Sequence, residues 1–248
     1  MFEACQIPPL CRLIPLAPDA DVGAETRRRA NAGADPGTIL CAAREDVLDC
    51  AIILHPEVPL GQAMLALYVG ALGFGAGLGA VAPPMVDVTY HWPNRIDAIT
   101  GSVAEIDLIL PDSAGPESVP DWLAVRVTAV IGPLPVDGMR QGFPRTSLRD
   151  DGCVDLTVAE LLEAFARHFL TWINRWQDDG FEPVRALWLR HAPDHGETIE
   201  IEVEGKQVSG VFQGIDDDGA LMLAQDSATL RVALDGAPTV TGDVIGGG

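Results

Sequence analysis

The fold is indicated most clearly by the segment Val88-Thr-Tyr-His-Trp-Pro-Asn-Arg-Ile96. Apolar and aromatic residues stand on both sides of a polar turn that contains a proline, a pattern typical of two strands joined by a short connection. We therefore predict a strand over residues 86–90, a turn over 91–94 and a second strand over 95–100. A third strand is expected over 103–110, so this part of the chain belongs to a sheet.

The residues on either side of this stretch predict a sheet that is covered by helices. The clearest helix spans residues 156–177, where large apolar side chains recur at helical spacing on one face. Residues 133–151 hold Gly and Pro and are a candidate for a loop or lid. Further strands are expected over 12–16, 38–42, 47–55 and 122–131, and further helices over 21–31, 60–80 and 181–190. The fold class is therefore α+β, with a mixed β-sheet packed by helices.

The longest apolar stretch, residues 64–84, is rich in Gly and Ala. Its length suits either a core helix or a membrane span, but its amphipathic start and the lack of basic flanks favour a core helix. Within it, Gly73-Phe-Gly-Ala-Gly-Leu-Gly79 does not follow a strand and open a helix, as a nucleotide-binding loop does. We expect these glycines to pack the helix end closely on the sheet.

The pattern of residue types along the sequence changes after Pro193. Apolar and acidic residues alternate from Ile199, and short strands are expected over 208–215, 220–224 and 229–234. Strands that are so short and so close together predict a small β-barrel. We therefore divide the chain into a larger domain, 1–193, and a small C-terminal barrel, 194–248.

The composition restricts the partners and the chemistry. The formal net charge of −20 predicts a surface that repels phosphate backbones and anionic lipids, so we expect neither nucleic acid nor a membrane as a partner. The five cysteines include no CxxC pair, and the histidines lack a third ligand nearby, so we expect no metal site and a cytoplasmic location. The single lysine, Lys206, excludes any mechanism that needs a lysine in the larger domain.

Two stretches carry a resemblance to a known family. Residues 88–96 are similar to the strand of biotin protein ligases that ends in Lys-Trp-Pro-Asn-Asp. Residues 197–234, centred on Gly210-Val-Phe-Gln-Gly-Ile-Asp-Asp-Asp-Gly-Ala-Leu-Met-Leu223, resemble the small SH3-like barrel that closes those ligases. The chain is identified as a divergent relative of the biotin and lipoate protein ligases.

The resemblance implies a two-step acyl transfer. Such a ligase joins biotin or lipoate to ATP with Mg, releases pyrophosphate, and passes the acyl group from the adenylate to a lysine on a carrier protein. It implies ATP and Mg with biotin or lipoate as cofactors, a small carboxylate as ligand and a biotinyl or lipoyl carrier domain as partner. Family members often pair through the sheet, so the resemblance also permits a homodimer.

Several residues depart from the family's pattern. His91 stands where the family has the lysine that contacts the acyl carboxylate and phosphate, and a histidine of ordinary pKa carries little charge at neutral pH. Arg95 replaces the acid after Trp-Pro-Asn, and we predict that it acts with His91 as the catalytic pair. Segment 41–50, CAAREDVLDC, has no glycine where the family has a Gly/Arg-rich loop over the adenylate. The predicted ligand-binding residues are Arg44, Trp92, Asn94, Gly101, Glu105 and Arg126.

Each cation also has a structural alternative. Arg44 and Arg95 suit surface turns, and Arg126 suits an edge or solvent-facing position where the family has a glycine. Gly101 and Glu105 are alternatives for the family's small glycine beside the acyl chain. Three functions remain: a divergent working ligase, a non-catalytic binder of a small carboxylate or acylated carrier domain, and an ATP-independent transferase for which no activated nucleophile is evident. Because the lysine and the Gly/Arg-rich loop are missing, we expect a ligase-like protein that can have lost the adenylation activity. We expect its ligand pocket beside His91 and Trp92.

Overall fold

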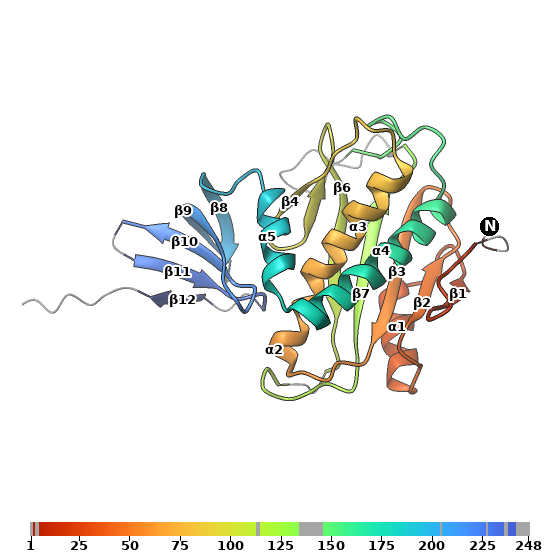
Figure 1. The fold of residues 1–248 in the computed structure, drawn as a ribbon, viewed down its shortest axis with the longest axis horizontal. Helices are drawn as coiled ribbons and strands as arrows, with labels where there is room; N and C mark the ends of the chain where they lie inside the picture. Colours follow the sequence, from red (N-terminus) through yellow and green to blue (C-terminus); the bar gives the residue numbers. More distant parts are fainter. Residues whose placement is uncertain are drawn as a thin grey trace, which may run out of the picture.

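The computed structural model describes residues 2, 5–112, 115–133, 146–203, 205–226, 228–235 and 238–241. Much of the expected loop or lid over 133–151 lies outside these residues. Figure 1 shows a larger unit built of strands and helices beside a smaller unit of strands. The strands of the larger unit are β1 (Arg12–Leu16), β2 (Thr38–Ala42), β3 (Val47–Leu54), β4 (Thr89–His91), β5 (Arg95–Asp97), β6 (Ser102–Ile109) and β7 (Leu123–Val130). Its helices are α1 (Val22–Asn31), α2 (Leu60–Ala63), α3 (Ala66–Val81), α4 (Val158–Asp179) and α5 (Glu182–Arg190).

The larger unit contains one mixed sheet with the strand order β1-β2-β3-β7-β6-β5-β4. Strands β1 and β2 pair in parallel, whereas the other neighbours pair antiparallel. Strand β5 stops at Asp97, earlier than expected, because a register shift after Ile96 breaks its pairing with β6. The short β5 leaves the far half of β6 without a neighbouring strand on that side among the described residues.

The two faces of this sheet are covered differently. Helices α3 and α4 pack together on one face, and α1 lies on the other (Figure 1). A Cβ atom at Gly73 would lie 2.9 Å from Cα of Phe169, and one at Gly77 would lie 2.9 Å from the backbone nitrogen of Phe165. Gly73 and Gly77 therefore bring α3 against α4 and not against the sheet, whereas Gly75 packs on the sheet as expected, because a Cβ there would overlap Tyr90 of β4.

Helix α3 is the buried core helix that the sequence predicted. By length and composition alone, Leu60–Val81 could cross a membrane, with a mean hydropathy of 1.8, but 67% of that window is buried inside the protein. Burial on this scale is what a core helix shows, because both the sheet and α4 cover it. Helix α4 begins at a capping box in which Thr157 and Glu160 satisfy each other's backbone N–H groups.

The smaller unit is a sheet with the strand order β12-β11-β10-β9-β8, antiparallel throughout. Its hairpin between β9 and β10 turns at Gly219, whose φ of +79° favours glycine. Tyr68 of α3 donates a hydrogen bond of 2.6 Å to the carbonyl of Gly219 and so holds this hairpin against the larger unit. The strands are β8 (Thr198–Val203), β9 (Lys206–Ile215), β10 (Leu221–Gln225), β11 (Ala228–Val232) and β12 (Pro238–Thr241).

Candidate functional site

His91 ends β4 and is held between two carboxylates. Its Nδ1 lies 2.6 Å from Asp194 and its Nε2 lies 3.2 Å from Asp97. Burial of the ring lowers the pKa of His91, but the hydrogen bonds with Asp97 and Asp194 outweigh it and leave the pKa raised. The expectation of a histidine with an ordinary pKa was therefore wrong, and the charge of the protonated ring is balanced within the chain.

Arg95 begins β5 directly opposite His91. Its Nε lies 2.9 Å from Oδ1 of Asp97, the same carboxylate that contacts His91. Both predicted catalytic side chains thus meet at one aspartate that sequence reasoning missed. Trp92, next in the turn, packs against the core, and its buried indole nitrogen has no hydrogen-bond partner among the described residues.

Four side chains form a row across the α1 face of the sheet, which we call the polar row: Asp49, Arg126, Asp107 and Asn94. Arg126 of β7 donates two hydrogen bonds of 2.9 Å to Asp49 of β3. Asp107 of β6 pairs opposite Arg126 and accepts a 2.8 Å hydrogen bond from the Asn94 amide. Because β7 lies between β3 and β6, Arg126 is not an edge residue, which corrects that alternative.

The charges of the polar row are partly buried. Burial raises the pKa of Asp107, although the hydrogen bond from Asn94 acts in the opposite direction. The side chain of Arg126 is 28% exposed, and its Nη1 lies next to the first turn of α1, 3.5 Å from where a Cβ at Gly23 would stand. Arg126 therefore keeps one nitrogen directed toward that helix end while Asp49 occupies the other two.

The remaining predicted residues divide into those near this row and those away from it. Glu105 lies in β6 between Arg95 and Thr128, two residue pairs along the strands from Arg126 and on the same face. Gly101 lies in the β5–β6 connection, where its carbonyl accepts the backbone N–H of Ala98. Arg44 pairs with Asp46 inside its own short turn, at 2.6 and 2.9 Å. Of the two alternatives for the family's glycine, Glu105 is the one that adjoins the polar row.

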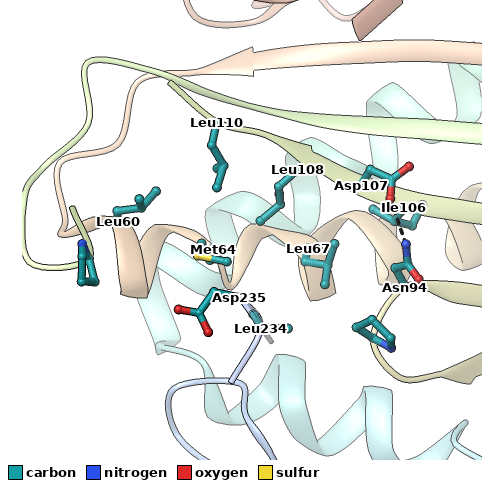
Figure 2. Close-up of a pocket in the computed structure, with 12 residues that line it drawn as sticks. Leu60, Met64, Leu67, Asn94, Ile106, Asp107, Leu108, Leu110, Leu234 and Asp235 are labelled. Atoms are coloured by element: carbon teal, nitrogen blue, oxygen red, sulfur yellow. Dashed lines mark hydrogen bonds between the residues drawn. The ribbon is translucent and has the colours of Figure 1, made fainter. Parts of the chain in front are cut away.

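A cavity of about 420 Å³ opens beside the Trp-Pro-Asn turn, and we call it the barrel-side cavity. Figure 2 shows Leu108 of β6, and Leu110 just after it, facing the helical segment of Leu60, Met64 and Leu67, with Asp235 of the barrel loop on the opposite wall. Pro93 and Asn94 line it, whereas His91 and Trp92 are not among its lining residues. The remaining lining residues are Ile106, Asp107, Pro116 and Leu234.

The sequence and the fold are similar to those of known proteins. The model of the Biotin/lipoate A/B protein ligase family matches residues 7–190, and that of the Biotin protein ligase C terminal domain matches residues 194–237. The chain belongs to the biotin/lipoate A/B protein ligase family. The biotin--[acetyl-CoA-carboxylase] ligase of Paracoccus denitrificans is 29% identical over 174 residues, which are 69% of this chain and 71% of the relative.

Solved structures agree with this family. A biotin protein ligase-like protein of unknown function from Silicibacter sp. TM1040 is 32% identical, with a TM-score of 0.84 over 93% of this chain and 97% of that chain. The biotin protein ligase of Aquifex aeolicus in complex with biotin and ATP has a TM-score of 0.69 at 17% identity, over 94% of this chain and 99% of that chain. The mixed sheet, its helices and the SH3-like C-terminal sheet are thus the fold of the biotin protein ligase family.

ATP is a cofactor that this family implies, but the residues of this site that the structure describes do not fit a triphosphate. Phosphates are bound by cations and by backbone N–H groups that glycines leave accessible. Arg126, Arg95 and His91 each have a carboxylate of this chain as partner. The turn that replaces the Gly/Arg-rich loop holds Arg44 on Asp46 and contains no glycine. The carboxylates Glu105 and Asp107 beside them add negative charge where the phosphates require positive charge.

The carboxylates are the part of this site that sequence reasoning missed. Asp49, Asp97, Asp107 and Asp194 lie in four different segments, and only cross-strand register and the return of the chain at Asp194 bring them to the cations. The sequence held one signal, since Asp49 and Asp107 interrupt apolar strands. A charge inside a buried strand needs a partner of opposite sign, so Arg126 could have been matched to them.

Proposed function

We propose that this member of the ligase family recognises an acyl group that is already joined to a carrier lysine, and that it has lost most of the adenylate-forming reaction. One observation carries the proposal: the cations of the site, His91, Arg95 and Arg126, already have carboxylate partners in the chain. A biotinyl or lipoyl group is the class of acyl group that the family suggests.

The charge of the ligand decides between a free acid and an acyl amide. A free carboxylate would bring one more negative charge to a region that already holds Asp49, Asp107 and Glu105. It would have to displace one of them from its partner, which leaves a partly buried charge unpaired. An acyl group in amide linkage is neutral, and it needs only hydrogen-bond donors and acceptors.

The polar row can supply such groups without any rearrangement of its ion pair. Arg126 Nη1 is a donor directed toward the first turn of α1, and the Asn94 side chain has an amide oxygen besides the nitrogen that it gives to Asp107. Thr128 and Glu105 continue the row along β7 and β6. We expect a bound acyl amide to lie across these residues.

A working ligase is the second candidate function. The match of both family models and the retained Trp92-Pro93-Asn94 turn favour it. In that case biotin, lipoate or another small acid would react with ATP despite the lost lysine, and pyrophosphate would be released.

Two measurements on the full chain separate the candidates. Calorimetric titration with N-acyl-lysine amides (biotinyl, lipoyl and octanoyl) and with the free acids measures which form is bound, and we expect the amides to bind at least about tenfold more tightly, because the acid's charge is unfavourable. A pyrophosphate assay with ATP, Mg and each acid should show no release above the protein-free rate. Acid-dependent pyrophosphate release would establish the ligase instead, and equal or weaker binding of all three amides would remove the proposed binder.

A matched pair of variants assigns the binding to the polar row. The double variant Asp49→Asn with Arg126→Gln removes the ion pair while it keeps the net charge of the region, and we expect it to lose acyl-amide binding. Arg44→Gln removes a cation whose partner lies in its own turn, and it should bind like the unchanged protein. Equal binding by all three proteins would place the site elsewhere.

A further inference from the structure

The linker between the two units, residues 191–197, is held against strand β4. At its start, the Tyr90 N–H of β4 donates a hydrogen bond of 3.0 Å to the carbonyl of His191. Farther along, Asp194 contacts the ring of His91 at the end of β4, where 2.6 Å separates its carboxylate from Nδ1. The strand that leads into the Trp-Pro-Asn turn is therefore tied directly to the segment that leads into the barrel.

The His91 ring can hold both of its carboxylate partners only while it is protonated. Nδ1 lies 2.6 Å from Asp194, and Nε2 lies 3.2 Å from Asp97 of β5. An ionised carboxylate only accepts hydrogen bonds, so each ring nitrogen needs a hydrogen of its own. A neutral imidazole has one N–H and one lone pair, whereas the imidazolium ion has two N–H groups. Loss of one proton must therefore break one of the two contacts.

Three charged groups face the His91 ring in the part of the chain that the structure describes. Asp97 and Arg95 come from β5, and Asp194 comes from the linker; the hydroxyl group of Thr89, on β4 itself, lies 3.5 Å from Nε2. Arg95 opposes a charge on the ring, but its Nε lies 2.9 Å from the Asp97 carboxylate, which offsets it. The two carboxylates prevail, and the pKa of His91 is raised.

The contact with Asp194 is the one that opens when the ring loses a proton. The Asp194 side chain is 41% exposed, whereas that of Asp97 is 21% exposed. A carboxylate that is released into water costs less than one that stays buried without a donor. The remaining hydrogen therefore stays on Nε2, toward Asp97. The lone pair of Nδ1 then faces an acceptor at 2.6 Å, which is repulsive, and Asp194 moves away.

We propose that His91 and Asp194 form a pH-sensitive latch, closed on the protonated ring and open on the neutral one, which fixes the linker to β4 beside the Trp-Pro-Asn turn. Opening the latch frees the linker but does not detach the barrel. The barrel hairpin stays attached to α3, because Tyr68 donates its hydrogen bond of 2.6 Å to the Gly219 carbonyl at any of these pH values. This latch goes beyond the acyl-group recognition proposed above and does not depend on it.

The test is nuclear magnetic resonance of the full chain from mildly acidic to alkaline buffer. Ring nitrogen shifts report the titration and tautomer of His91, and hydrogen exchange, corrected for its intrinsic pH dependence, reports the protection of the Tyr90 amide. We expect this protection to fall about tenfold as His91 loses its proton, the effect of one charge-assisted hydrogen bond, while the Phe165 amide in α4 keeps its protection. Constant protection of Tyr90 through the titration, or a neutral ring with its hydrogen on Nδ1, would overturn the proposal.

Two linker variants separate the latch from a general loosening of the linker. Asp194→Asn keeps the size of the side chain but removes its charge, so the pKa of His91 should fall and the protection of Tyr90 should be lost at a correspondingly lower pH. His195→Gln is the matched control, because the His195 ring lies 3.1 Å from the carbonyl of Gln213 and should not affect the titration of His91. An unchanged midpoint in Asp194→Asn, or equal shifts in both variants, would contradict the latch.

Discussion

The two faces of the seven-stranded sheet are held by opposite kinds of interaction. On the α3 and α4 face, glycines and apolar side chains pack so closely that Cβ atoms at Gly73 and Gly77 would lie within 3 Å of the backbone of α4. On the α1 face, the central strands carry the ion pair of Arg126 and Asp49, which continues to Asp107 and Asn94. The first face specifies the fold by shape, and the second sets what the site can bind by charge.

The largest effect is expected on the packed face. Gly73→Val places a branched side chain against the backbone of Phe169, which cannot move without shifting α4. Overpacking of this kind costs about 3 kcal/mol, the upper part of its usual range, in the free energy of unfolding. Urea denaturation followed by circular dichroism measures this loss.

Gly79 is the matched control on the same helix. A Cβ there would meet nothing within 4 Å, so Gly79→Ala adds helix propensity without a clash. We expect it to stabilise the protein by about 0.5 to 1 kcal/mol. If both variants were destabilised alike, the glycines would matter for some reason other than the contact of α3 with α4.

The next largest effect is expected on the polar face, from loss of the ion pair between Arg126 and Asp49. Arg126→Gln leaves the mostly buried Asp49 without its bidentate partner. We expect a loss of about 2 kcal/mol in the free energy of unfolding, less than for a fully buried pair because the Arg126 side chain is 28% exposed. Adding Asp49→Asn should recover most of the lost stability, because it removes the unpaired charge of Asp49. A double-mutant cycle by urea denaturation gives the coupling energy, and a value near zero would mean that the pair is only a surface contact.

The sequence could predict the helices and strands of this sheet, but it could not predict which charged residues meet on its polar face. Helices and strands followed from local patterns, so β1, β2 and the long helix α4 appear where they were expected. The polar row depends on register between strands that are far apart in the sequence, such as Asp49 and Arg126. Residue types alone showed which cations were present, but not that His91 and Arg126 would each find a carboxylate. The partner of α3 was predicted only in part for the same reason: Gly75 faces the sheet as expected, whereas Gly73 and Gly77 face α4.

A smaller effect depends on pH. The pKa of His91 is raised in the folded protein, because its hydrogen bonds with Asp97 and Asp194 outweigh the effect of burial. Protonation is thus favoured by folding, so this stabilisation is fully present below the unfolded-state pKa and is lost as pH rises through the higher folded-state pKa. Relative to His91→Gln, the unchanged protein should gain on the order of 1 kcal/mol in mildly acidic buffer and lose that advantage above neutral pH. Unfolding curves of both proteins across this range measure it, and a difference that grew with pH would contradict the assignment.

The smallest effect concerns Arg44, which the sequence analysis predicted to bind the ligand. It pairs with Asp46 two residues away, with 41% of its side chain exposed, and exposed pairs of this kind contribute little. Arg44→Ala should therefore change the free energy of unfolding by less than about 0.5 kcal/mol and leave acyl-amide binding unchanged. A loss of binding without a loss of stability would mean that the β2–β3 turn reaches the ligand. Ligand binding would then depend on the β2–β3 turn as well as on the polar face of the sheet, whose charges are paired within the chain.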